Sequence, residues 1–326
     1  MESKVTKTVL LTGGAGFIGS NLIEKLLHQK YRVICIDNFD STYNPKFKIE
    51  HIAPFLQNKN FVLHITDIRD LEALRAIFEK EKPTYVAHLA AKADTREAVN
   101  NPYDYISVNI DGTLNILELS RDFSVKKVVL ASSGSVYGNN PNTPWKEEEN
   151  TDFPLSAYGA TKKATEMLAY TYHHNFEMNI ICLRYFNVYG ENNRPNMVPY
   201  KWAAAIFSGK EVELSGEGTR KRDFTYVKDV VEATILALKS PLKYEILNIA
   251  NSHPVSLKEL LAVFEKVTGI KPKVHSRPSH NASANEMYAD SAKAKKLLGW
   301  KPKVSIEEGT AKLVSWFREK RLEKYS

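Results

Sequence analysis

The sequence predicts an α/β fold, in which a doubly wound parallel β-sheet has helices on both faces and is followed by a smaller C-terminal lobe. Three observations support this prediction. Short apolar runs alternate with segments of helical periodicity through the first half of the chain. A glycine-rich turn, Gly-Gly-Ala-Gly-Phe-Ile-Gly, separates the first apolar run from the first helical segment. Beyond about residue 190, frequent prolines and glycines break the chain into short pieces.

The predicted strands are short apolar runs, and they lie at Thr8–Thr12, Arg32–Asp37, Phe61–Thr66, Thr84–Ala90, Lys127–Ser132 and Asn179–Phe186. The predicted helices have helical periodicity, and they lie at Phe17–Leu27, Leu71–Phe78, Tyr103–Ser120, from just before Tyr158 to His174, Leu257–Thr268 and Ile306–Arg318. We expect residues 1–190 to form a Rossmann-type dinucleotide-binding domain. We expect residues 191–326 to form a substrate-binding lobe, with some crossover of the chain between the two.

The composition is that of a globular protein with a hydrophobic core, since 43% of the 326 residues are hydrophobic and 25% are charged. The formal net charge is +7, but Lys and Arg are spread along the chain, so nucleic-acid binding is not expected. Cys35 and Cys182 lie in apolar runs and are expected to be buried and reduced. We find no zinc-ligand pattern, signal segment or membrane-spanning run, and expect a cytoplasmic protein without a metal.

The glycine turn predicts a dinucleotide site. Gly13, Gly16 and Gly19 follow a strand and precede a helix, so the backbone can approach a pyrophosphate at the helix N-terminus. Asp37 ends the next strand, where its carboxylate can accept hydrogen bonds from the ribose hydroxyls of the adenosine. That charge would repel the extra phosphate of NADP, so we predict NAD. We expect other contacts beside the turn and at strand ends, from Phe17, Ile18, Asn38, Asp67, Ile68, Leu89, Ala90, Ala91, Lys162 and Tyr185.

Tyr158 and Lys162 are four residues apart, so on a helix they share one face with Cβ atoms about 5–6 Å apart. A free phenol has a pKa near ~10 and is a poor base at neutral pH. A neighbouring ammonium lowers that pKa, and an oxidised nicotinamide would add a second positive charge. Two ordinary surface residues would show the same spacing. However, Ser132 and Ser133 close a predicted strand at the edge of the sheet where ligands gather, which favours a catalytic site.

Five segments in order carry a resemblance to a known family. They are the glycine turn, Ser-Ser-Gly-Ser-Val-Tyr-Gly (132–138), Tyr-x-x-x-Lys (158–162), Leu-Arg-Tyr-Phe-Asn-Val-Tyr-Gly (183–190) and Arg-Asp-Phe-Thr-Tyr-Val (222–227). Together they resemble the extended short-chain dehydrogenase/reductase family that acts on nucleotide sugars, and within it the UDP-sugar 4-epimerases. The resemblance extends over about residues 7–320.

The resemblance implies an isomerase in which hydride leaves carbon 4 of the sugar for NAD and returns to the other face of a 4-keto intermediate. Tyr158 would remove and return the proton of the 4-hydroxyl, and Ser133 would contact that hydroxyl. Lys162 would hold the nicotinamide ribose. Asn187 and Arg222 would bind the diphosphate of the substrate.

Related activities are separated by single positions. Dehydratases of the family carry an Asp-Glu pair where this chain has Gly134 and Ser135, which argues against elimination of water. A uronate substrate would pass through a β-keto acid, so a decarboxylase stays an alternative, as do a 4-ketoreductase and a non-catalytic nucleotide-binding relative. The family usually forms homodimers, and by resemblance we expect one here, through the helices at Tyr103–Ser120 and Tyr158–His174.

The sugar is indicated by two segments, 37–48 and 193–197, which resemble those of UDP-glucuronate 4-epimerases. By that resemblance Arg194 would hold the substrate carboxylate, although a solvated loop arginine would look the same. Val198, at the start of the following segment, is expected to contact substrate. We therefore predict UDP-glucuronate and UDP-galacturonate as the substrate pair.

Two departures weaken the uronate prediction and keep the alternative pair, UDP-glucose and UDP-galactose, open, and a third position bears on N-acetyl sugars. Asn187 replaces the threonine of the uronate subgroup and is the residue of UDP-galactose epimerases. His280 stands where epimerases often have a diphosphate-binding arginine, and is either a weaker phosphate donor or a loop residue. Met287 occupies the position that limits the 2-substituent of the sugar, and its bulk disfavours N-acetyl sugars.

Overall fold

The computed structural model describes residues 7–278 and 284–324 of the chain. Within these residues the central sheet has seven strands in the order β3-β2-β1-β4-β5-β6-β9, and all neighbouring strands run parallel. The strands are β1 (Thr8–Thr12), β2 (Arg32–Asp37), β3 (Phe61–Ile65), β4 (Tyr85–His88), β5 (Lys127–Ser133), β6 (Ile180–Tyr185) and β9 (Tyr244–Ile249). The order changes direction between β1 and β4, and ligands bind outside the carboxyl ends of the strands at such a point.

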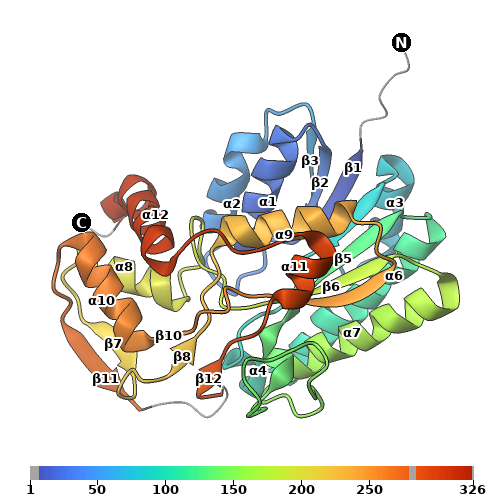
Figure 1. Ribbon diagram of the computed structural model, residues 1–326. Coiled ribbons are helices and arrows are strands. Elements are labelled where there is room, and N and C mark those ends of the chain that lie inside the picture. The colour runs from blue at the N-terminus through green and yellow to red at the C-terminus, as the bar shows by residue number, and fades with distance from the viewer. Residues whose placement is uncertain (1–6, 279–283, 325–326) are drawn as a thin grey trace.

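Helices cover both faces of this sheet, and they come from distant parts of the chain (Figure 1). One face carries α1 (Phe17–His28), α9 (Val227–Lys239) and α11 (Ala292–Leu298). The other face carries α3 (Leu71–Glu81), α6 (Gly112–Asp122) and α7 (Ala157–Phe176). The strands read as continuous apolar runs because both of their faces are buried: Leu11 and Val129 face one core, whereas Leu10 and Val128 face the other.

A smaller lobe lies beside the carboxyl ends of the strands, at the left of Figure 1. Its helices are α8 (Val198–Phe207), α10 (Leu257–Thr268) and α12 (Ile306–Lys320). Its short strands are β7 (Val212–Ser215), β8 (Lys221–Arg222), β10 (Val255–Ser256), β11 (Val274–Arg277) and β12 (Glu286–Met287). Strand β7 pairs with β11, and β8 lies between β10 and β12.

Short helical segments complete the connections. They are α2 (Lys46–Ile52), α4 (Glu97–Asn100), α5 (Pro102–Ile106), a π-helical segment (Ser107–Asp111) and 3₁₀ turns at Ala53–Phe55, Gly134–Tyr137 and Leu322–Lys324. No helix in the described ranges is both long and apolar enough to cross a bilayer. His280 falls outside the described residues, so its two interpretations stay open.

The α/β fold with a parallel sheet is confirmed, and the six predicted strands all form. The helix predicted at Tyr103–Ser120 is interrupted, because α5 and α6 are joined by the π-helical segment. The seventh strand, β9, was not predicted. Together with α9 and α11, it joins the sheet from beyond residue 190.

Candidate active site

The glycine turn between β1 and α1 is too tight for side chains. Gly13 has φ +69°, and a Cβ there would lie 2.8 Å from the backbone nitrogen of Ala90. A Cβ on Gly19 would lie 2.3 Å from the carbonyl oxygen of Gly13. No side chain caps the N-terminus of α1, so its first N–H groups are available to an anion. The turn therefore has the form of a pyrophosphate cradle.

Asp37 ends β2 beside this turn, and its carboxylate has two backbone partners and one charged partner. Oδ2 accepts a hydrogen bond from the N–H of Ala15 (3.1 Å), and Oδ1 accepts one from the N–H of Phe39 (2.9 Å). The Lys48 ammonium lies 3.5 Å from Oδ1. Asp37 thus orders the glycine turn as well as facing the cavity, which the sequence did not reveal.

A cavity of about 560 Å³ opens at the carboxyl ends of the strands. Every predicted cofactor residue lines it, together with most of the predicted substrate residues: Gly13, Gly16, Phe17, Ile18, Gly19, Asp37, Asn38, Asp67, Ile68, Leu89, Ala90, Ala91, Ser133, Tyr158, Lys162, Tyr185, Asn187, Arg194, Val198 and Arg222. Met287 lines a smaller cavity of about 170 Å³, to which Asn187 and Arg222 also belong. The structure therefore gathers these residues around two cavities that share part of their walls.

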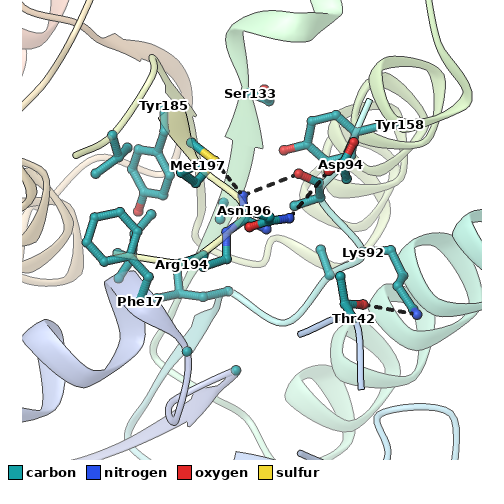
Figure 2. Close-up of a pocket in the computed structure, with 18 of the residues that line it drawn as sticks. Phe17, Thr42, Lys92, Asp94, Ser133, Tyr158, Tyr185, Arg194, Asn196 and Met197 are labelled. Atoms are coloured by element: carbon teal, nitrogen blue, oxygen red, sulfur yellow. Dashed lines mark hydrogen bonds between the residues drawn. The ribbon is translucent and has the colours of Figure 1, made fainter. Parts of the chain in front are cut away.

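Tyr158 lies near the start of α7, with its ring edge-on to Tyr105 at a centroid distance of 6.5 Å. Burial raises the pKa of the Tyr158 phenol above its ordinary value, and a hydrogen bond from Ser133 and the positive charge of Arg194 offset this only in part. From the sequence we expected Lys162 to supply the positive charge that lowers the pKa of Tyr158. In this structure Arg194, reaching across the cavity, supplies a positive charge of that kind (Figure 2).

Lys162 lies one turn further along α7, and its ammonium donates a hydrogen bond to the carbonyl of Ala131 on β5 (2.7 Å). Burial lowers the pKa of Lys162 to about 8, against opposing effects of Cys182 and Glu166. The ammonium form is therefore present at neutral pH and is lost as the pH rises through about 8. A catalytic role that needs its charge would weaken in that range.

Arg194 extends from the loop before α8 into the cavity, toward the side of Tyr158 and Asp94 (Figure 2). Its Nη2 donates to the carbonyl of Ala93 (3.4 Å) and contacts Sδ of Met197 (3.3 Å). Both partners are uncharged, and none of the ion pairs formed by the described residues involves Arg194. The guanidinium is therefore held in the cavity by uncharged groups and has no ion-pair partner among the described residues.

Several residues that line the cavity were not predicted from the sequence. Two of them lie in the loops after β2 and β4. Lys92, after β4, forms ion pairs with Asp40 (3.1 Å) and Asp104 (3.0 Å), which ties the loop after β2 to α5. The Tyr43 hydroxyl of that loop is buried without a hydrogen-bond partner. Lys92 follows a strand end, so the rule that located Ser133 could have found it. Tyr43 belongs to segment 37–48, and the resemblance of that segment to UDP-glucuronate 4-epimerases could have marked it. Among the described residues, no cluster of His, Cys, Asp and Glu could hold a metal ion.

A phenol, an ammonium and a hydroxyl facing a dinucleotide turn place the protein in the class of short-chain dehydrogenases. The family model described as GDP-mannose 4,6 dehydratase matches residues 10–313. A UDP-glucuronate 4-epimerase of Thermodesulfobacterium geofontis is 42% identical over 312 residues, which cover 95% of this chain and 96% of that protein. The chain belongs to this family, that of the extended short-chain dehydrogenases/reductases.

Solved structures of similar proteins agree over nearly the whole chain. The UDP-glucuronic acid 4-epimerase of Bacillus cereus, in complex with UDP-glucuronic acid and NAD, has a TM-score of 0.90 and 31% identity. The UDP-glucose 4-epimerase of Thermotoga maritima, with UDP-glucose, has a TM-score of 0.89 and 34% identity. Each comparison covers 96% of this chain and 99% of the other.

Proposed function

We propose that the protein is an NAD-dependent UDP-sugar 4-epimerase that interconverts UDP-glucuronate and UDP-galacturonate. The observation that carries the choice of sugar is that Arg194 lines the cavity of Ser133 and Tyr158 and has no ion-pair partner among the described residues. An arginine recognises a carboxylate with two parallel hydrogen bonds. The 42% identical relative is named a UDP-glucuronate 4-epimerase, which supports the same substrate pair.

The cavity fits NAD. The turn at Gly13 and Gly19 leaves room only for backbone, the N-terminus of α1 is uncapped, and the carboxylate of Asp37 faces the same cavity. A bound NAD would supply the acceptor and donor of hydride for carbon 4 of the sugar. The solved epimerase of Bacillus cereus contains the same cofactor.

The chain's own residues manage the proton and the orientation of the sugar. Tyr158 takes the proton of the 4-hydroxyl through its phenolic oxygen and later returns it, while Ser133 holds that hydroxyl. The charge of Lys162 supports the phenolate and positions the ribose. Arg194 pairs with the carboxylate and thereby keeps it out of line with the ketone, which disfavours loss of carbon dioxide.

The diphosphate is assigned to Asn187 and Arg222, which line both cavities. Burial lowers the pKa of Arg222 to about 10, so the guanidinium is still charged at neutral pH. Its Nη1 donates to the carbonyls of Lys221 (2.7 Å) and Asn285 (3.1 Å), and these bonds hold its position. Arg220 lines the main cavity as well and adds a second positive charge.

Proton NMR of the purified protein with UDP-glucuronate or UDP-glucose, without added reductant, tests the proposed function. Signals of UDP-galacturonate from the first substrate would support it. Formation of UDP-galactose alone would keep the chemistry and make Asn187 the better guide to the sugar. A pentose product would indicate a decarboxylase, and no product from either sugar would contradict the proposal.

Replacing Asp37 by Asn should weaken the preference for NAD over NADP. The substitution removes the charge that would repel a 2′-phosphate, and Lys48, 3.5 Å away in the native protein, remains to attract it. We expect the ratio of the two dissociation constants to shift by about tenfold toward NADP, or ~1.4 kcal/mol. Titration of nucleotide-free protein measures this ratio. The control Lys48→Gln keeps Asp37 and should not improve NADP binding, and an unchanged ratio in Asp37→Asn would remove its proposed role.

We also propose a homodimer, formed by the surface where α5 and α6 lie beside α7. Exposed apolar side chains gather there, among them Tyr103, Ile106, Leu114, Met167 and Tyr170. Tyr103 is 84% exposed and Met167 60%, which is unusual for a surface in contact only with water. Two copies related by a twofold axis would bury this surface on both.

Light scattering should give twice the 36.9 kDa mass of one chain, and the double substitution Met167→Glu/Tyr170→Glu should give that of a monomer. Ile270→Glu, an exposed apolar position of the smaller lobe, is the control and should leave the mass unchanged. A monomeric native protein would contradict the proposed dimer.

The functional division follows the two lobes. We propose that residues 1–190 bind the cofactor and that residues 191–326 bind the nucleotide sugar, apart from the segments α9, β9 and α11 that join the sheet. Ser215, Arg220, Phe224 and Leu257 bring the second lobe to the main cavity. Both cysteines are free and buried, which supports a reducing, cytoplasmic setting.

A further inference from the structure

A fully buried ion pair lies directly beneath the catalytic residues. Glu166 on α7 accepts two hydrogen bonds from Arg184 on β6, from Nε to Oε1 and from Nη2 to Oε2, both at 2.8 Å. The exposed fractions of the two side chains are 1% and 2%. Removing two charges from water is costly, so a pair at this depth needs excellent geometry and further hydrogen bonds.

The pair obtains those further bonds from the strand that ends in the catalytic serine. Ser132 donates to Oε1 of Glu166 (2.6 Å), and it precedes Ser133. Ser132 also faces Arg184 in the parallel register of β5 and β6. Consequently the carboxylate of Glu166 links α7 to the carboxyl ends of both strands, at the level where the cavity begins.

On its other side, Arg184 is held by an aromatic group. Its Nη1 donates to the hydroxyl of Tyr137 (2.8 Å), and its guanidinium lies 4.7 Å from the centre of that ring. Tyr137 in turn donates to Oδ1 of Asn248 on β9 (2.8 Å) and stacks on Trp145 at 4.8 Å. The chain of contacts thus runs from α7 across β5 and β6 to β9.

Glu166 occupies the same face of α7 as the catalytic pair, because Tyr158, Lys162 and Glu166 follow one another at intervals of four residues. We propose that Ser132, Glu166 and Arg184 form an ionic brace that positions Tyr158, Lys162 and Ser133 relative to one another, and that the charge of Glu166 acts on the Lys162 ammonium. Glu166 is a positioning residue, since its contacts are with Ser132 and Arg184. The inference rests on the proposed function.

The groups around Lys162 determine how far the charge of Glu166 affects the pKa of Lys162. Burial lowers the pKa of Lys162 to about 8, and Cys182 and Glu166 oppose this. Burial also raises the pKa of the Cys182 thiol and lowers that of His88 to about 3, so both are neutral at neutral pH. Other titratable groups of this region are the phenols of Tyr158, Tyr185 and Tyr105 and the guanidinium groups of Arg184 and Arg194. Of the two groups that oppose the effect of burial on Lys162, Glu166 is the one that carries a negative charge at neutral pH.

The test is Glu166→Gln, which keeps the shape of the side chain and removes its charge. We expect kcat at pH 7 to fall about tenfold or more, equivalent to ~1.4 kcal/mol, while KM for the UDP-sugar and NAD content stay within about twofold. The fall of activity at alkaline pH should begin at a lower pH than in the native protein, because Lys162 loses its proton earlier. Steady-state kinetics as a function of pH, with NAD content and melting temperature, measure these quantities.

Two further variants separate the brace from a loss of stability. Glu81→Gln removes another buried carboxylate, paired with Arg32 and far from the cavity, and should lower the melting temperature without moving the pH profile. Ser132→Ala removes the hydrogen bond to Glu166 and should lower kcat about threefold or more. It keeps both charges of the ion pair, so the pH at which activity falls on the alkaline side should not change. If Glu166→Gln does not fold, the kcat of Ser132→Ala alone tests the proposed brace.

A native kcat and pH profile in Glu166→Gln, or a native kcat in Ser132→Ala, would overturn the inference. A loss of kcat that is accompanied by equal losses of NAD and of substrate affinity would overturn it as well, since it would indicate only general destabilisation. The kinetics use whichever UDP-sugar the native protein converts. An unexpected product therefore contradicts the proposed function without affecting the test of the brace.

Discussion

Tyr158→Phe is expected to lower kcat by about 10²–10⁴-fold, because the substitution removes the group that we propose carries the proton. The ring remains in place against Tyr105, at the 6.5 Å centroid distance of the native protein, so the packing of α7 should not change. NAD affinity should stay within about twofold of the native value, since the glycine turn and Asp37 are untouched. Turnover followed by NMR and nucleotide titration by fluorescence measure the two effects.

Tyr170→Phe provides a matched control for this prediction, because it removes a phenolic hydroxyl from the same helix outside the cavity and keeps the apolar ring on the proposed dimer surface. Its turnover should equal that of the native protein. If Tyr158→Phe kept turnover within tenfold of the native rate, another group would have to carry the proton, and the mechanism would be wrong.

The second large effect is expected for Arg194→Met, which keeps an unbranched side chain of similar length and removes the guanidinium. A hydrogen bond to a charged group contributes about 1.5–3 kcal/mol. Losing the two parallel hydrogen bonds to the carboxylate should therefore lower kcat/KM for UDP-glucuronate by about 10²-fold. Arg194 also lowers the pKa of Tyr158, and a smaller loss common to all sugars should follow from that. The quantity to measure is therefore the ratio of kcat/KM for UDP-glucuronate to that for UDP-glucose.

Arg194→Lys refines the same experiment, because it keeps the charge and removes the two-pronged geometry. Its ratio should lie between those of the native protein and Arg194→Met. Equal losses with both sugars would show that Arg194 acts on Tyr158 and not on the carboxylate, and would return the choice of sugar to Asn187.

Strand and motif predictions succeeded where local sequence is sufficient. The run Lys127–Ser132 is apolar on both faces, and the structure places it in the middle of the parallel sheet as β5. The glycines at 13, 16 and 19 permit only a tight turn, and a Cβ at Gly19 would collide with the carbonyl of Gly13. Such features can be predicted from the sequence because they depend on residues close together in the chain.

Other features depend on long-range contacts and had no local signal. Strand β9 joins the sheet through pairing with β6, about sixty residues earlier in the chain. The position of Arg194 beside Tyr158 results from folding of the loop before α8 against the loop after β4, where it meets the carbonyl of Ala93. In the same way, the sequence does not distinguish Glu166 from any other glutamate on a helix. Its role depends on Arg184, which lies on β6 and pairs with it only in the folded protein.

The sequence by itself determined the parallel α/β fold and the glycine turn, and it identified the acidic residue proposed to favour NAD and the Tyr158–Lys162 pair, since each follows from side-chain type and spacing within one or two elements. Only the tertiary structure decided which charges act on that pair. Arg194 approaches Tyr158 from the smaller lobe, and Glu166, buried with Arg184, acts on Lys162 from below. The physical reason is that electrostatic effects depend on distance and on exclusion of water, and both are set by packing between segments remote in sequence.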